Sequence, residues 1–304
     1  MTGEWEDMEK GALWDRVVAT TRQALTAGIL VPVPTNYTFI EDHGVRFFIR
    51  VLSGLGRKDE ARKKQKAAVE RGKSANPFLP PEKDLVVADI SGTHLALLNK
   101  FNVVENHLLI VTRAFEDQDM LLTLPDFEAL WLCMAEYDSL GFYNGGREAG
   151  ASQQHKHLQL VPLPLAPEGP RVPVEPLLAH APEGMGTVPG FLFQHSFARL
   201  GGDLTGSPLK AARKAFELYR TMLSNVGMTA PQLTGPVRQS MPYCLLVTRD
   251  WMLLVPRSME FFEDISLNSL AFAGSFFVRN EQQLDRLKSF GPMNALRRVA
   301  LPER

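Results

Sequence analysis

The apolar residues of the chain recur at helical spacing in several stretches. In the first of them, Leu13, Val17 and Leu25 mark the repeat. In another, Pro125 stands in the first turn, where a helix tolerates proline best because that N–H has no partner within the helix. The pattern predicts helices over residues 11–30, 124–140, 208–227 and 281–289.

Shorter apolar runs are typical of strands. VRFFIRVL predicts a strand over residues 45–52, and THLALLNKF and HLLIVTR predict two strands joined by the turn NVVEN. YCLLVT and WMLLVP predict a further pair around a turn at residues 249–250. Residues 162–190 are rich in Pro and Gly and are expected to be irregular. Helices mixed with hairpin-linked strands indicate an α+β fold with an antiparallel sheet.

The sequence GASQQHKHLQLV, residues 150–161, carries the strongest chemical signal. In a strand over 154–161, His155, His157 and Gln159 share one face, because side chains alternate. The other face carries Lys156, Leu158 and Leu160. Two histidines on one face can bind zinc, but Gln159 is a poor third ligand and no cysteine cluster is present. A metal site is therefore the weaker interpretation.

A Gly-rich turn, NGGREAGASQQ, leads directly into this strand. The backbone N–H groups of such a turn can surround phosphate oxygens. Followed at once by paired imidazoles, the turn indicates nucleophilic catalysis at phosphorus. One ring would attack while a backbone carbonyl holds its far nitrogen as N–H and so fixes the tautomer.

The strand resembles the His-x-His-x-His pattern of the histidine-triad superfamily, in the nucleotidyltransferase variant whose third position is Gln. The wider resemblance is to the ATP adenylyltransferases, the diadenosine tetraphosphate phosphorylases. Five blocks carry it in the family's order: NPFLPPEKDL, LLNKFNVVENHLLIVTR, FYNGGREAGASQQHKHLQ, WMLLVPRS and NSLAFAGSFFVRN. The resemblance implies a HIT-like antiparallel sheet flanked by helices, with a catalytic core over 1–165 and a C-terminal region over 166–304 that completes the site.

The resemblance also implies roles for individual residues. His157 would be the nucleophile that carries AMP, His155 would orient it by a hydrogen bond, and Gln159 would bind a phosphate or bridging oxygen. Substrate binding is implied for Lys58, Asn99, Lys100, Asn144, Gly150, Ala151, Ser152, Gln153, Asn268, Ser269, Leu270 and Arg279. Lys58 is chosen from a basic segment over 57–73 because it lies nearest the preceding strand. Arg279 stands where the family more often has lysine, and Ser275 where it more often has methionine.

The implied reaction is phosphorolysis of diadenosine tetraphosphate to ATP and ADP through a covalent His157–AMP, with adenylyl transfer from adenosine 5′-phosphosulfate as a further family activity. Glutamine has no titratable proton, which suits a nucleotide leaving group that departs as an anion. A sugar-1-phosphate uridylyltransferase-like enzyme also uses His-x-His-x-Gln, but the absence of Cys and His metal spacing weighs against it. A non-catalytic nucleotide sensor would not need the nucleophile.

Composition adds limits. The chain has 304 residues, 45% hydrophobic and 22% charged, with a net charge of −1, so neither nucleic acid nor a membrane surface is an expected partner. Cys133 and Cys244 lie in apolar stretches, as in a reducing compartment. The acidic N-terminus does not resemble a signal peptide, and we expect a cytoplasmic protein. We expect a monomer or homodimer with no tightly bound cofactor, any Mg²⁺ entering with the nucleotide.

Overall fold

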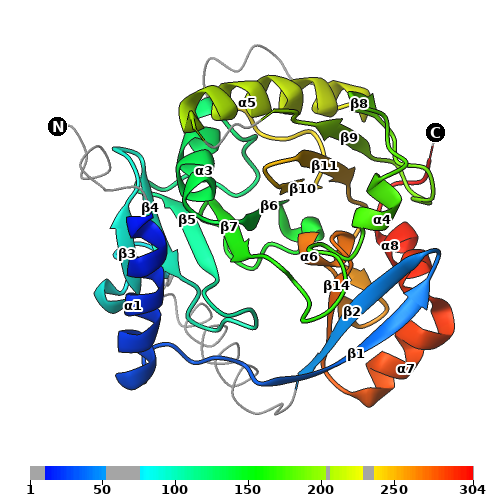
Figure 1. Cartoon of the computed structure of the whole chain (residues 1–304), viewed down its shortest axis with the longest axis horizontal. Coiled ribbons are helices and arrows are strands. Elements are labelled where there is room, and N and C mark those ends of the chain that lie inside the picture. The colour runs from blue at the N-terminus through cyan, green and yellow to red at the C-terminus, as the bar shows by residue number, and fades with distance from the viewer. Residues whose placement is uncertain (1–10, 53–75, 203–205, 229–235, 304) are drawn as a thin grey trace.

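The computed structural model describes residues 11–52, 76–202, 206–228 and 236–303. Its centre is a nine-stranded sheet (Figure 1). In spatial order the strands are β3 (Val86–Asp89), β4 (His94–Leu98), β5 (Leu108–Thr112), β7 (His157–Pro162), β6 (Ser139–Gly145), β10 (Tyr243–Val247), β11 (Trp251–Pro256), β9 (Ser196–Arg199) and β8 (Met185–Gly186). Each neighbouring pair is antiparallel. The expected α+β fold with an antiparallel sheet is confirmed.

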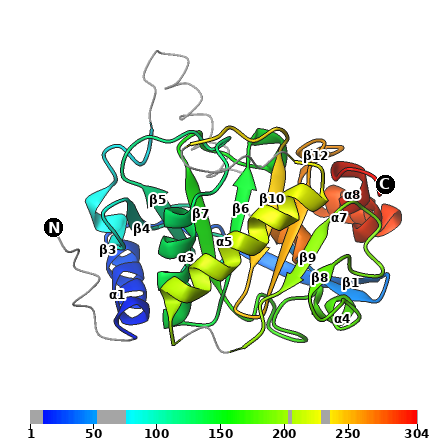
Figure 2. The same cartoon turned by 90° about the horizontal axis from the view of Figure 1, so that it is seen from above.

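Helices cover one face of this sheet. They are α1 (Ala12–Thr26), α3 (Leu124–Glu136) and α5 (Pro208–Asn225). Figure 2 shows α3 and α5 crossing the strands on the same side. Trp131 on α3 and Tyr219 on α5 are fully buried in the same apolar core as Leu158 and Leu160 of β7. This face is a purely structural core, apart from a buried ion pair described below.

A second, smaller sheet and the C-terminal helices lie beyond the opposite face. The sheet contains β1 (Thr35–Asp42), β2 (Val45–Leu52) and β14 (Ser275–Val278), with β14 parallel to β2. Near it lie α4 (Glu175–Leu178), β12 (Phe261–Phe262), β13 (Ile265–Ser266), α6 (Ser269–Phe272), α7 (Glu281–Phe290) and α8 (Pro292–Val299). The short helix η1 (Lys83–Leu85) packs against α1 instead, and η2 (Arg147–Ala149) packs against β6 and β10. An apolar core that includes Phe142, Phe276 and Leu296 joins the two layers.

Several expected boundaries were wrong. The helix expected over 11–30 ends at Thr26, because Gly28 takes a left-handed conformation, φ 68°, and closes the helix. The helix expected over 124–140 ends at Glu136, because Tyr137 is extended and Ser139 already belongs to a buried strand. The strand over 154–161 begins only at His157, and His155 forms an isolated bridge with Asp117.

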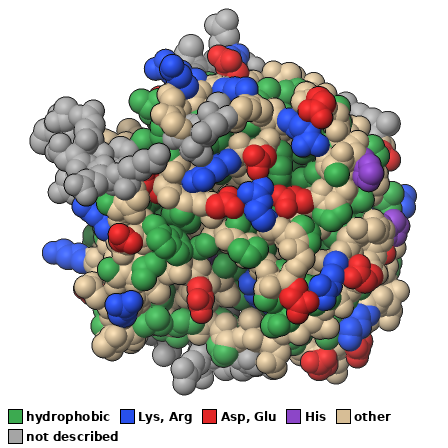
Figure 3. All heavy atoms as spheres, viewed as in Figure 1, with side chains coloured by type: hydrophobic (Ala, Val, Ile, Leu, Met, Phe, Trp, Pro, Cys, Tyr) green, Lys and Arg blue, Asp and Glu red, His purple; other side chains and the backbone are tan. Residues whose placement is uncertain are grey.

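The space-filling view shows acidic and basic side chains interspersed over the face drawn in Figure 3. Both cysteines are free and buried, as expected. In the described part of the chain, no helix is long and apolar enough to cross a membrane.

Candidate active site

The alternation expected along the histidine strand is present. The rings of His155 and His157 both contact Phe78, at 5.6 and 5.5 Å between centroids. Lys156 points to the helical face, where its Nζ lies 2.6 Å from Asp126 of α3. Gln159 lies on the histidine side of the ladder and is partly exposed. The two imidazoles therefore share one face, with the buried lysine between them on the other.

His157 is held in one orientation and one tautomer. Its Nδ1 donates to the backbone carbonyl of His155 at 2.8 Å, so the Nε2 lone pair is the ring's nucleophile. The side chain is 4% exposed. Burial lowers the pKa of His157 to about 4, and the ring is therefore neutral near pH 7. This is the N–H-to-carbonyl arrangement that the sequence predicted for an attacking imidazole.

The hydrogen bond that His155 was expected to make with His157 comes from its backbone carbonyl, and the His155 ring has other partners. The ring itself lies toward the end of β5, where Nε2 donates to the Thr112 carbonyl at 2.8 Å and lies 2.9 Å from the Thr112 hydroxyl. Nδ1 then accepts from the Asn76 amide at 2.9 Å. Burial lowers the pKa of His155. These bonds fix the peptide whose carbonyl orients His157.

Gln118 was missed by sequence reasoning. The β6–β7 ladder ends at the pair Phe142–Gln159, and in the same register Asn144 and His157 would face each other two positions further along. The Gln118 side chain stands between them instead: its amide nitrogen donates to the Asn144 carbonyl at 2.9 Å and the His157 carbonyl at 3.2 Å. Its amide oxygen accepts from the His157 N–H at 2.8 Å. A single buried amide thus joins His157 to the Gly-rich turn.

The Gly-rich turn and the C-terminal block meet, as expected. The Asn144 side-chain oxygen accepts from the Ser269 N–H at 2.9 Å and from its hydroxyl at 2.7 Å. Gly150 has φ 92°, and a Cβ there would lie 2.8 Å from Cβ of Asn268, so only glycine fits. Asn268 caps α6 by accepting from the N–H of Leu270, which is buried. Residues more than a hundred positions apart thus form one buried polar contact.

The remainder of the turn leads from Gly150 to the histidines. Ala151 donates its N–H to the Gly146 carbonyl at 3.2 Å and is partly exposed. Ser152 is exposed and Gln153 partly exposed, so both are accessible to a ligand.

Asn99 and Lys100 lie elsewhere. They directly follow Leu98, the last residue of β4. Leu98 pairs with Leu108 of β5, which pairs with Leu160 of β7, so both residues lie toward the end of β7 that is opposite His157. The Asn99 amide lies 3.3 Å from His107, and Lys100 forms an ion pair with Glu82 at 2.6 Å. Neither residue is adjacent to His157.

Arg279 and Lys58 are the last two residues that were predicted to contact the substrate. Arg279 follows β14 and donates its backbone N–H to Gln283 at 2.7 Å. Lys58 lies outside the described residues.

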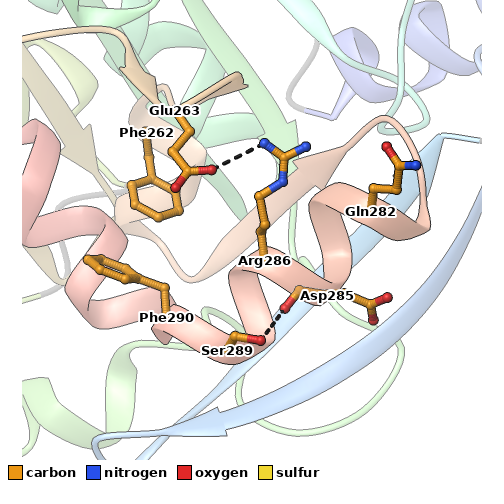
Figure 4. Close-up of a pocket in the computed structure, with 7 residues that line it drawn as sticks. All are labelled: Phe262, Glu263, Gln282, Asp285, Arg286, Ser289 and Phe290. Atoms are coloured by element: carbon orange, nitrogen blue, oxygen red, sulfur yellow. Dashed lines mark hydrogen bonds and ion pairs between the residues drawn. The ribbon is translucent and has the colours of Figure 1, made fainter.

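A hollow of about 510 Å³ lies apart from these residues (Figure 4). It is formed by β12 and α7, with the rings of Phe262 and Phe290 stacked at 4.6 Å and Arg286 paired with Glu263. None of the predicted site residues lines it. In the ranges that the structure describes, no group of three or more His, Cys, Asp or Glu could hold a metal ion.

Two domain families match the sequence. The Ap4A (diadenosine tetraphosphate) phosphorylase N-terminal domain matches residues 4–180, and the ATP adenylyltransferase C-terminal domain matches residues 189–302. Diadenosine 5′,5′′′-P1,P4-tetraphosphate phosphorylase 2 of Saccharomyces cerevisiae is 27% identical over 273 residues, 80% of this chain and 79% of the relative. Protein APA1 of the same yeast is 26% identical over 241 residues, 72% of this chain and 74% of the relative.

Solved structures show the same fold. Yeast Ap4A phosphorylase Apa2 in complex with AMP superimposes with a TM-score of 0.76 at 21% identity, over 98% of both chains. The same yeast enzyme in complex with Ap4A gives a TM-score of 0.74 at 20% identity, over 96% of this chain and 98% of the other. Because the first domain match alone spans more than half of the sequence, the chain belongs to the Ap4A phosphorylase family.

Proposed function

We propose that the protein cleaves Ap4A with inorganic phosphate to ATP and ADP through a covalent adenylyl group on His157. The observation that carries this proposal is the neutral, buried imidazole whose Nδ1 is fixed by the His155 carbonyl at 2.8 Å. Membership of the Ap4A phosphorylase family and the name of the yeast relative support the substrate and the reaction.

In the first step, Nε2 of His157 attacks the phosphorus of a terminal adenosine phosphate. The new P–N bond forms as the P–O bond to the next phosphate breaks, and ATP leaves with the electron pair of that bond. The attached imidazole then carries positive charge, which its Nδ1–H shares with the His155 carbonyl. In the second step, a phosphate oxygen attacks the same phosphorus, the P–N bond breaks, ADP leaves and the neutral ring is restored.

Gln159 supports transfer to phosphate in this proposal. Its amide can donate to a phosphate or bridging oxygen but supplies no proton, and neither leaving group requires one. The substrate phosphates would lie against Asn144 and the backbone of Gly150, Ala151, Ser152 and Gln153, with Asn268, Ser269 and Leu270 on the other side. In this proposal the exposed Ser152 and the partly exposed Gln153 supply polar groups to the phosphate oxygens.

The more distant contacts complete the proposal. Asn99 and Lys100 would contact the nucleoside or the phosphate chain, and Lys58 and Arg279 the distal phosphates. We propose that a divalent cation, where needed, arrives with the nucleotide, and that adenosine 5′-phosphosulfate can also load His157. We further propose a cytoplasmic monomer or homodimer that does not bind nucleic acid.

Product analysis tests this function. Wild-type protein is incubated with Ap4A with and without phosphate, and the nucleotides are separated by chromatography. We expect equal amounts of ATP and ADP that depend on phosphate, and none from His157→Asn. Release of AMP independent of phosphate would indicate a hydrolase, and tight binding without turnover would indicate a sensor. Exchange between uridine nucleotides and sugar phosphates would support the uridylyltransferase-like alternative.

A further inference from the structure

Arg257 is a buried cation directly behind the proposed phosphate site. It is 1% exposed and lies just after β11. Its five described acceptors are four backbone carbonyls and the sulfur of Cys244, with no carboxylate among them. An arginine in a protein interior is normally paired with an acid, because burial of an unpaired charge is costly. A buried arginine that has no carboxylate among its partners at this position therefore indicates a functional role.

The carbonyls that Arg257 binds belong to the two segments that form the site. One guanidinium nitrogen donates to the Ala149 carbonyl at 3.4 Å, and the other donates to the Leu267 carbonyl at 2.8 Å. The next residue in each segment is Gly150 and Asn268, whose backbones pack against each other. Arg257 therefore fixes the plane of both peptide groups at the point where the Gly-rich turn meets the cap of α6.

The same side chain fastens this point to the C-terminal part of the fold. Its Nε donates to the Val299 carbonyl at 3.1 Å, and Nη2 donates to the Met259 carbonyl at 2.8 Å. The guanidinium also lies over the ring of Phe272 of α6, 5.1 Å from its centroid. The planar fork can reach all these groups at once because its five N–H donors point in fixed directions.

We propose that Arg257 is a positioning residue for nucleotide binding and adenylyl transfer. It aligns the peptides at Gly150 and Asn268 so that their segments present a fixed set of donors to substrate phosphate. Its positive charge, left without a carboxylate, favours the phosphate further. Arg257 does not itself contact the substrate. The proposal rests on the proposed function for the reaction step, but not for the binding of nucleotide phosphate.

Arg257→Lys is the main test variant. Lysine keeps a positive charge but has three donors on one nitrogen, and cannot reach the carbonyls of four segments. Arg249→Lys is the matched control: its guanidinium also donates to a backbone carbonyl, that of Met134 at 2.8 and 2.6 Å, but in the turn that joins β10 and β11, away from the site residues. Arg257→Met, which loses the charge as well, is a second variant.

Two quantities are measured at a temperature well below the unfolding transition of each variant: the affinity for AMP, by equilibrium titration, and the single-turnover rate of AMP transfer from Ap4A. We expect Arg257→Lys to weaken AMP binding and slow the transfer at least about tenfold each, Arg257→Met to be worse in both, and Arg249→Lys to remain within about twofold of wild type.

A purely structural arginine would give another result. If folded Arg257→Lys bound AMP and transferred it as wild type does, or if Arg249→Lys lost as much, Arg257 would not position the site. A wild type that binds AMP but is never adenylylated would refute the proposed function, while the AMP affinities of the variants would still decide the role of Arg257.

Discussion

Among single residues, His157 combines two properties that an exposed histidine lacks. Burial holds the ring neutral, and the carbonyl of His155 holds its proton on Nδ1. An imidazole attacks phosphorus only with an unprotonated nitrogen, so a lowered pKa widens the pH range in which the nucleophile is competent.

The pH dependence of AMP transfer follows from this shift. The pKa of His157 lies at about 4, below the ordinary value of about 6.5. The rate should therefore stay level as the pH falls from about 8 to about 5 and decrease only as it passes through about 4, where the ring gains a proton. Quenched single-turnover assays at each pH measure this. A loss of rate centred near 6.5 would show that the ring titrates as in water.

Gln118 provides a second test at this scale. Gln118→Ala leaves the His157 N–H and the Asn144 carbonyl without the partners they have now. Each buried group left unpaired costs about 1–3 kcal/mol, so we expect both lower resistance to urea and slower AMP transfer. Gln282→Ala, on the exposed side of α7, should change neither. Equal effects of the two variants would contradict the role given to Gln118.

The sequence predicted the part of the site that lies on continuous segments. Alternation placed His155, His157 and Gln159, and the glycines marked the turn proposed to bind phosphate. Asn76, Thr112 and Gln118 were not predictable in the same way, because they reach the histidines through loops and a neighbouring strand whose positions depend on the whole fold. The direction of the His155 ring was not predictable for a related reason: it depends on Thr112 of the neighbouring strand.

Among the elements, β7 is fixed from its helical face by a buried ion pair. Lys156 Nζ lies 2.6 Å from Asp126 and 3.2 Å from Glu116, and His94 lies 3.1 Å from the other Asp126 oxygen. Burial alone would raise the pKa of Asp126, but Lys156 and His94 hold it well below its ordinary value. The contacts join the start of β7 to the first turn of α3, directly between the two histidines.

Asp126→Asn should therefore destabilise the fold strongly. It leaves the fully buried Lys156 ammonium without its nearest carboxylate, and removal of one partner of a buried pair costs about 3–5 kcal/mol. Urea unfolding monitored by tryptophan fluorescence measures the loss. Asp119→Asn is the control, since its ion pair with Arg238 is exposed and should contribute under about 1 kcal/mol. Similar losses for the two variants would mean that Lys156 finds other partners.

Elements with a strong apolar period were predictable, and others were not. The strand expected over 45–52 is β2 as observed, and α5 and α7 differ from expectation only at their ends. The strand β1 was missed because its residues are all partly or fully exposed and show no apolar alternation. The pairing of β14 with β2 could not be read from either segment, since it joins residues more than two hundred positions apart.

In the whole molecule, one sheet crosses the boundary between the two matched domains. β6 belongs to the first and β10 to the second, and they pair from Gly141–Val247 to Gly145–Tyr243. Every residue of β6 is buried. The two halves therefore complete one sheet as well as one site, since Asn144 and Ser269 meet across the same boundary.

Residues 1–180 alone should consequently not form a stable unit. Their β6 would become an exposed apolar edge, which favours association with other chains. We expect this fragment to aggregate or to lack a cooperative thermal transition, and to recover both solubility and AMP binding when it is co-expressed with residues 181–304. Calorimetry and size-exclusion chromatography check this. A monomeric 1–180 that melts cooperatively would show that the first half folds independently.

The covalent bond between His157 and AMP is the central claim, and intact mass spectrometry tests it most directly. Wild-type protein and His157→Asn are mixed with Ap4A in the absence of phosphate, denatured and weighed. The account predicts one added adenylyl group on the wild type, located on the peptide that contains His157, removed as ADP when phosphate is supplied, and absent from the variant. Consumption of Ap4A by the wild type without any adduct, or an adduct of equal extent on His157→Asn, would contradict it.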